Sequence, residues 1–237
     1  LSVMSFVRTF MSLLYSPYSS RYNHYHGSGD INGLQRFVKK IIVELSPMVC
    51  CSIIILSCLA IPFVESWVGD AYMLSALLIS IMVISFIPNF ISTPISAYFI
   101  AKEENLRLIK LNVVNVLIYW VGIIATIHWT GIYSFAIFKS IAPILVVIGY
   151  WIMAKNDFNE SGRTFISFIG LLKTLLFPTI VALGLCKIAG NFMIYEHSKS
   201  ALFNNLLIMG CCLALSLFAA LLANKQMRNT VFSLIKR

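Results

Sequence analysis

Residues 111–129 read LNVVNVLIYWVGIIATIHW, a run without any Lys, Arg, Asp or Glu. Its apolar residues follow one another, whereas the strands of a membrane β-barrel alternate apolar and polar residues. A helix of this length is long enough to cross about 30 Å of hydrocarbon. The stretch therefore predicts a transmembrane α-helix.

The rest of the chain repeats this pattern. Of the 237 residues, 59% are hydrophobic and 11% are charged, against roughly 45–50% and 25% in soluble domains. A single soluble core is thereby excluded. We predict an all-α, polytopic transmembrane bundle with about seven spans, at residues 1–19, 42–64, 71–97, 111–129, 133–154, 165–188 and 201–223.

The beginning of the chain also carries information. It starts at Leu1 and enters an apolar stretch at once, with no preceding basic segment. We interpret the sequence as the C-terminal part of a longer protein, so targeting signals are not expected within it.

Lys and Arg residues predict the orientation, because cytoplasmic flanks retain positive charge. Thirteen of the 18 flank alternate connections and the C-terminus, two lie in the opposite connections, and three lie within spans. The cytoplasmic set is Arg21, Arg36, Lys39, Lys40, Lys102, Arg107, Lys110, Lys155, Arg163, Lys225, Arg228, Lys236 and Arg237. The C-terminus is thus predicted to be cytoplasmic. The net charge of +9 reflects topology, and no nucleic-acid partner is expected.

The first cytoplasmic connection contains an apolar stripe at helical spacing. Its members are Ile31, Leu34, Phe37, Val38 and Ile41. Asp30 is a suitable N-cap. The stripe predicts either a helix lying at the inner interface or an amphipathic lead-in to the second span.

Three cations lie inside predicted spans: Arg8, Lys139 and Lys173. A charge at the centre of a membrane helix costs about 2.5–3.5 kcal/mol on insertion scales, so such groups occupy polar cavities or are paired. Glu44 is the one carboxylate with a comparable place. The cationic excess favours an anionic passenger; the alternative is that each cation reaches a headgroup or pairs with a carboxylate.

Proline and polar residues within the spans suggest moving parts. Proline removes a backbone donor and bends a helix, which suits helices that rock between two states but also occurs in static bundles. The hinge candidates are Pro47, Pro88, Pro94, Pro143 and Pro178. Candidates for a polar path or for bonds between helices are Asn89, Ser92, Thr93, Ser96, Asn112 and Asn115.

Signals for catalysis are weak. His24 and His26 form an HxH without an acidic partner at ligand spacing, and there is no Walker A loop, GxSxG or DxD-like pair. The six cysteines lie in or beside apolar spans without CxxC spacing, so we expect them to pack in the core. The sequence predicts a transporter rather than an enzyme, with no cofactor and no metal site.

The order of features supports a resemblance. A helix ending in LLYSPYSSRY precedes a GSGD turn and the amphipathic LQRFVKKII; a span then closes on WVGDAY, and a proline-bearing span runs into AYFIAKEENLRLIKLNVVNV. This order resembles the C-terminal half of the Wzx-type O-antigen flippases, the polysaccharide branch of the multidrug/oligosaccharidyl-lipid/polysaccharide exporter superfamily. The resemblance covers roughly residues 1–155.

The resemblance implies two pseudo-symmetric lobes around a central cavity. Residues 1–155 form the C-terminal lobe, and residues 156–237 form two additional transmembrane helices and a basic cytoplasmic tail. The implied activity is the transfer of undecaprenyl-diphosphate-linked O-antigen or polysaccharide units to the periplasmic leaflet of the bacterial inner membrane, by alternating access. Membrane lipids are further partners, and a coupling ion, H⁺ or Na⁺, stays undetermined.

Arg8 and Lys139 are implied to bind the diphosphate, with Lys173, Asn112 and Asn115 as further cavity or headgroup contacts. Two alternatives stay open. One is a cation-coupled multidrug exporter of the same superfamily, although intramembrane Asp and Glu are scarce here. The other is a membrane-embedded O-antigen polymerase, although the outside loops are all short.

Overall fold

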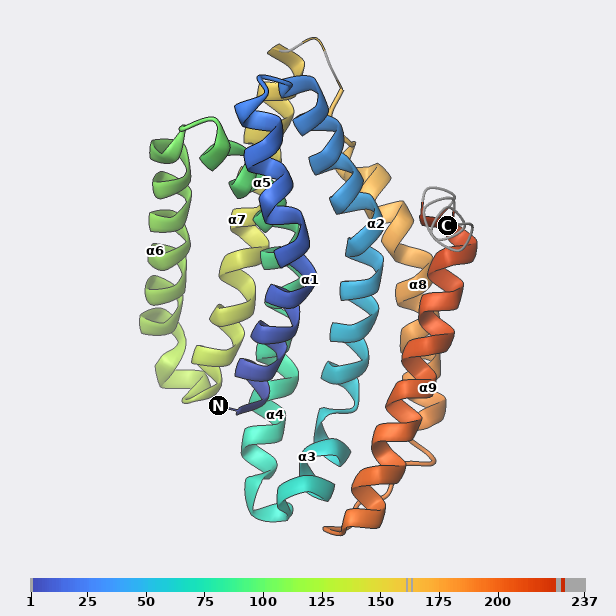
Figure 1. Cartoon of the computed structure of the whole chain (residues 1–237). Helices are drawn as coiled ribbons and strands as arrows, with labels where there is room; N and C mark the ends of the chain where they lie inside the picture. Colours follow the sequence, from blue (N-terminus) through green and yellow to red (C-terminus); the bar gives the residue numbers. More distant parts are fainter. Residues whose placement is uncertain (1, 161, 163, 225–226, 229–237) are drawn as a thin grey trace. The chain divides into compact units, whose positions relative to one another are not determined.

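The computed structural model describes residues 2–160, 162, 164–224 and 227–228. It is 88% helical, and the described residues form no strand. Figure 1 shows long helices joined by short connections. The all-α prediction is confirmed.

Six helical segments are long and apolar enough to cross a membrane. They are Ile31–Cys58, Asp70–Ala101, Asn105–Thr130, Tyr133–Glu160, Phe168–Ala189 and Lys199–Ala223. They correspond to six of the seven predicted spans. Helix α1 (Ser2–Gly27) has a similar length, but Tyr, Ser and His fill its second half, so it does not qualify as a seventh span by composition.

The chain forms two compact units. Unit 1 contains residues 1–42 and 85–168, and unit 2 contains residues 43–84 and 169–237. The chain therefore passes from unit 1 to unit 2, returns to unit 1, and enters unit 2 a second time. The division at residue 155 implied by the family resemblance is a different one and stays a prediction.

Unit 1 is built from α1, the first part of α2 (Ile31–Cys58), α5 (Phe86–Ala101), α6 (Asn105–Thr130) and α7 (Tyr133–Glu160). Helix α5 packs against α1 and α7, and α6 packs mainly against α7. Gly122 of α6 makes this close approach possible, because a Cβ atom there would collide with the ring of Phe138 on α7.

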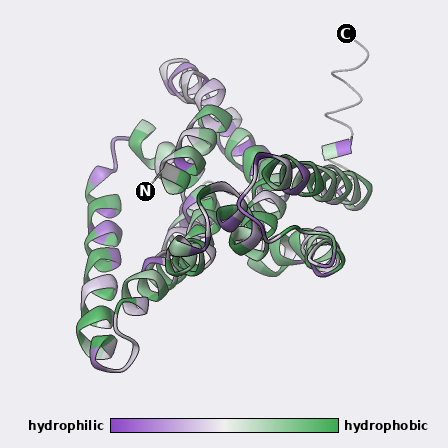
Figure 2. Ribbon diagram, turned by 90° about the horizontal axis from the view of Figure 1, so that it is seen from below, coloured by the Kyte–Doolittle hydropathy of each residue, from purple (hydrophilic) through white to green (hydrophobic). Residues whose placement is uncertain are grey.

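The outward face of α6 is apolar. Only 11% of its most apolar window is buried. The exposed residues include Val113, Val116, Leu117, Trp120, Val121 and Ile124. In Figure 2, hydrophobic residues colour the helices on outward as well as inward sides. Helices that are apolar all round belong in a membrane, where lipid covers their outer faces.

Helix α2 starts where the sequence predicts. The carboxylate Oδ1 of Asp30 accepts a hydrogen bond from the Gly33 backbone N–H at 2.7 Å, which is an N-cap. The apolar stripe is buried except for Ile31, which is 46% exposed. Because α2 continues without a break to Cys58, the stripe is the first part of the second span. The interpretation as a separate interfacial helix is wrong.

The third predicted span is interrupted. Helix α4 (Met73–Val83) and α5 are separated at Ile84 and Ser85. Pro88 accounts for the interruption, because it has no N–H for the Ile84 carbonyl and its ring would clash with that group. Pro88 itself lies in the first turn of α5, where a missing N–H is tolerated.

Unit 2 contains the rest of α2, together with α3 (Ala60–Val68), the 3₁₀ turn η1 (Asp70–Tyr72), α4, α8 (Phe168–Ala189) and α9 (Lys199–Ala223). Its core joins α2, α8, α9 and the α8–α9 connection through Cys51, Ile55, Leu59, Ala182, Cys186, Ala189, Met193 and Cys212. All six cysteines are free thiols, and four of them are buried. Packing is thus confirmed for those four, whereas Cys58 and Cys211 are exposed.

Asn205 of α9 connects three segments of unit 2. Its side chain is fully buried. The amide donates to the carbonyls of Pro62 at 3.2 Å and Ile194 at 2.9 Å, and its oxygen accepts from the Ile194 N–H at 3.0 Å. Asn205 thereby bonds both backbone groups of Ile194 in the α8–α9 connection and joins this connection to the Pro62 carbonyl of α3.

Replacing Asn205 with Ala should destabilise unit 2. The change removes three hydrogen bonds and leaves buried backbone groups unsatisfied, at a cost of about 1–3 kcal/mol. Thermal unfolding of the purified protein in detergent measures it. The matched control is Asn204→Ala, because Asn204 makes one long bond of 3.4 Å to the Phe192 carbonyl; equal losses in both variants would contradict the proposed role.

Candidate functional site

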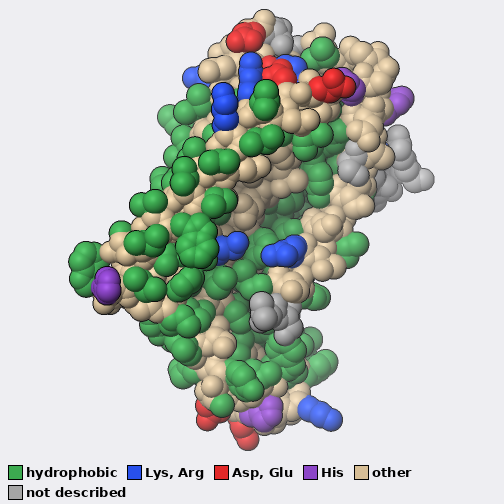
Figure 3. Space-filling view, turned by 90° about the vertical axis from the view of Figure 1, so that its left-hand side faces the viewer, with side chains coloured by type: hydrophobic (Ala, Val, Ile, Leu, Met, Phe, Trp, Pro, Cys, Tyr) green, Lys and Arg blue, Asp and Glu red, His purple; other side chains and the backbone are tan. Residues whose placement is uncertain are grey.

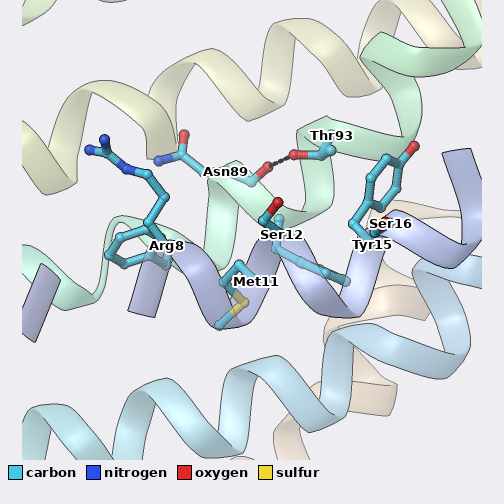
Figure 4. Close-up of a pocket in the computed structure, with 9 residues that line it drawn as sticks. Arg8, Met11, Ser12, Tyr15, Ser16, Asn89 and Thr93 are labelled. Atoms are coloured by element: carbon cyan, nitrogen blue, oxygen red, sulfur yellow. Dashed lines mark hydrogen bonds between the residues drawn. The ribbon is translucent and has the colours of Figure 1, made fainter. Parts of the chain in front are cut away.

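A cavity of about 490 Å³ lies between α1 and α5 within unit 1. Its lining residues are Arg8, Met11, Ser12, Tyr15, Ser16, Phe86, Asn89, Phe90 and Thr93. Figure 4 shows the side chains of Arg8 and Asn89 near one end of the cavity and those of Tyr15 and Thr93 near the other. The volume falls within the range of small-molecule sites.

Helical spacing brings the lining residues together. On α1 they recur at positions 8, 11, 12, 15 and 16, and on α5 at positions 86, 89, 90 and 93. Residues three, four, seven and eight apart share a helix face. One face of each helix therefore forms a wall of the cavity.

The chemistry of the cavity is cationic and hydrogen-bonding. Arg8 carries its one full charge, and no Asp or Glu is among the described lining residues. The Thr93 hydroxyl donates to the Asn89 backbone carbonyl at 2.7 Å, which fixes its direction while leaving its oxygen able to accept. A guanidinium beside amide and hydroxyl groups can bind an anionic group and its polar neighbours.

The structure brings together three residues that the sequence singled out separately: Arg8, Asn89 and Thr93. It does not bring the other cationic candidates to them. Lys139 on α7 is exposed and does not line the cavity. Lys173 is exposed on α8 and belongs to unit 2.

The two asparagines of α6 lie outside the cavity as well. The Tyr150 hydroxyl of α7 donates to Asn112 Oδ1 at 3.1 Å, which is a bond between two helices of the predicted kind. The Asn115 Oδ1 is buried and has no hydrogen-bond partner among the residues that the structure describes.

All five hinge candidates are buried in helices. Pro47, Pro94, Pro143 and Pro178 lie inside α2, α5, α7 and α8, which are continuous through them. Pro88 alone follows an interruption. A hinge role stays a prediction for all five.

A buried polar network was missed by the sequence analysis. At the end of unit 1 where α5 ends, the Gln35 Nε2 donates to the Tyr98 hydroxyl at 3.1 Å. Tyr98 donates to Asp157 Oδ2 at 2.5 Å, and Lys102 Nζ donates to Asp157 Oδ1 at 2.5 Å. Gln35, Tyr98 and Asp157 are each at most 4% exposed. The network joins α2, α5 and α7.

The network continues to the surface. Lys102 also pairs with Glu104 at 2.9 Å, and Glu104 pairs with Arg107 at 3.0 Å. Figure 3 shows charged side chains gathered at this end, where α5 ends and α6 begins. Burial alone would lower the pKa of Lys102, but its hydrogen bonds to Asp157 and Glu104 outweigh this effect and raise the pKa to about 12.

The ion pair should make stability depend on pH in a defined window. The pKa of Lys102 is about 12 in the folded protein against an ordinary lysine value of 10.5, so the folded state binds the proton more tightly. The stabilisation is fully present below pH 10.5 and is lost as the pH rises through 12. The free energy of unfolding of the wild type and of Lys102→Gln is measured between pH 9 and 12. The difference between the two should shrink as the pH rises.

The control for this measurement is Lys155→Gln, which removes an exposed lysine outside the network. The difference in free energy of unfolding between this variant and the wild type should not change over the same pH range. A wild-type to Lys102→Gln difference that is constant up to pH 12 would contradict the assignment.

No protein-family model, no curated protein and no solved structure matches the chain at a significant level.

Proposed function

We propose that the chain is part of a lipid-linked oligosaccharide flippase, which moves undecaprenyl-diphosphate-linked O-antigen or polysaccharide units from the cytoplasmic to the periplasmic leaflet by alternating access. One observation carries the proposal: the α1–α5 cavity contains a cation and neutral hydrogen-bonding groups but, among its described lining residues, no carboxylate.

This composition fits the headgroup of such a substrate. A diphosphate is anionic and accepts charge-assisted hydrogen bonds from a guanidinium. Sugars require hydroxyl and amide partners, which Ser12, Asn89 and Thr93 offer, and an aromatic surface such as that of Tyr15. Without such partners, moving the headgroup through hydrocarbon would leave many polar groups unsatisfied. The lipid tail can stay in the bilayer.

A cationic drug fits the cavity less well. Its positive charge would meet Arg8, and no described lining residue compensates that charge. A polymerase would be expected to present a long outside loop with basic catalytic residues, whereas the connections predicted to lie outside are short.

The proposal includes an orientation and a location. The excess of Lys and Arg on alternate connections supports a cytoplasmic C-terminus, and the bacterial inner membrane follows only from the proposed substrate. Lys139 is proposed as a diphosphate contact outside this cavity, because it is exposed on α7 and is not among the lining residues. A coupling ion, H⁺ or Na⁺, would supply the energy.

The test is the surface lipopolysaccharide of a strain that lacks the complete gene. Loss of the whole ladder on a gel, including the band with one repeat unit, and its restoration by a plasmid are expected. Survival of the single-unit band would instead identify a polymerase. An unchanged ladder would favour a drug exporter.

Arg8→Ala and Lys139→Ala in the full-length protein should each impair transport. Loss of a charge-assisted bond of about 1.5–3 kcal/mol corresponds to roughly tenfold to a hundredfold slower transfer. The readout is the amount of ladder restored per amount of membrane-inserted protein. The control is Lys187→Ala, which removes an exposed lysine from the last turn of α8; a normal ladder with both Arg8 and Lys139 replaced would refute the site.

A further inference from the structure

A second cavity, of about 370 Å³, lies at the end of unit 1 where α2 begins and α7 ends. Its lining residues are Gln35, Arg36, Lys39, Phe158, Gly162 and Thr164. We propose that this cavity binds the phosphate group of an anionic membrane phospholipid. The proposal does not depend on the flippase activity.

The first argument is charge. Arg36 and Lys39 are three residues apart on α2 and line the same cavity, so both cations can reach one anion. No Asp or Glu is among the described lining residues. The two nearby carboxylates along the chain are Asp157, which is bonded to Tyr98 and Lys102, and Glu160, and neither lines the cavity.

The second argument is that the floor of the cavity is fixed. Gln35 is 1% exposed and donates to the Tyr98 hydroxyl at 3.1 Å. Phe158 is 2% exposed, and its ring lies 5.5 Å from Tyr98 and 4.7 Å from Phe165. Arg36 is exposed and Thr164 adds a hydroxyl. A buried base with an exposed arginine at the rim suits a headgroup that stays in contact with water better than a fully buried ligand.

The third argument is depth. Arg36 and Lys39 lie in the first three turns of the span Ile31–Cys58, and Phe158 lies in the last turn of the span Tyr133–Glu160. The cavity therefore lies at the boundary between hydrocarbon and water, where lipid headgroups are found. Basic pockets between membrane helices on the cytoplasmic side are typical headgroup sites. This depth favours a lipid phosphate over one dissolved in the cytoplasm.

The experiment uses the full-length protein, delipidated in a neutral detergent. Phosphatidylglycerol is titrated and bound lipid is counted by native mass spectrometry, with zwitterionic phosphatidylcholine in parallel. Arg36→Gln/Lys39→Gln should bind phosphatidylglycerol about 30-fold more weakly, because each cation near an anionic headgroup contributes roughly a factor of five. The wild type should prefer phosphatidylglycerol to phosphatidylcholine.

The matched control is Lys110→Gln/Lys155→Gln, which removes two exposed positive charges of unit 1 outside the cavity. This variant should retain wild-type binding. Equal weakening in both double variants would mean that overall charge attracts the lipid, and would overturn the site. Lys39→Gln alone, expected to weaken binding about fivefold, tests the same point if the double variant does not fold.

A further arm separates the two sources of phosphate. Inorganic phosphate is added to the complex with phosphatidylglycerol. Displacement of the lipid at equal concentrations would show a site for free phosphate and overturn the lipid assignment, whereas retention supports it. Arg8 is unchanged throughout, so failure of this proposal and failure of the flippase proposal are distinguishable.

Discussion

The need to satisfy backbone hydrogen bonds without water governs this molecule. In hydrocarbon an unpaired N–H or C=O group has no solvent partner, so a chain that crosses it forms helices. Asp30 caps the start of α2 for this reason, and Asn205 supplies bonds to Pro62 and Ile194 where the helices of unit 2 end. In both cases a polar side chain supplies hydrogen bonds to backbone groups.

The same constraint separates structural charges from functional ones. Asp157 has its carboxylate oxygens bonded by Tyr98 and Lys102, and a network satisfied in this way stabilises packing. The Arg8 guanidinium forms no ion pair within the part of the chain that the structure describes. It faces a cavity lined by neutral polar groups. A charge left open in this way is available to a ligand, which is why the cavity, and not the more heavily charged network, carries the functional proposal.

The sequence predicts the helices well because apolar runs and their length suffice to recognise them. It also predicts Asp30 as a cap and the irregularity before Pro88, since both follow from local chemistry. The α1–α5 cavity was only partly foreseen, because pairing two helix faces requires knowledge of which helices touch. Ser12 and Tyr15 share the spacing of Arg8, and this spacing was the signal that could have identified them. The sequence around Asp157 does not predict its role in the network, because its partners Tyr98 and Lys102 lie more than fifty residues away along the chain.

Helix α5 contributes residues both to the cavity of the proposed function and to the buried polar network. Its first turn follows the interruption at Ile84 and Ser85, its middle contributes Asn89 and Thr93 to the cavity, and the network of Tyr98 and Lys102 holds its end. At the interruption the Ile84 N–H still donates to the Ile81 carbonyl and the Asn89 N–H to the Ser85 carbonyl, each at 3.3 Å, whereas Pro88 supplies no N–H to the Ile84 carbonyl, so a tilt there would not have to break that bond. In the proposed transport cycle, such a tilt would widen or narrow the cavity against α1 while the network stays intact. Of the five prolines, Pro88 is the one that follows an interruption between helices, and its role as a hinge stays a prediction.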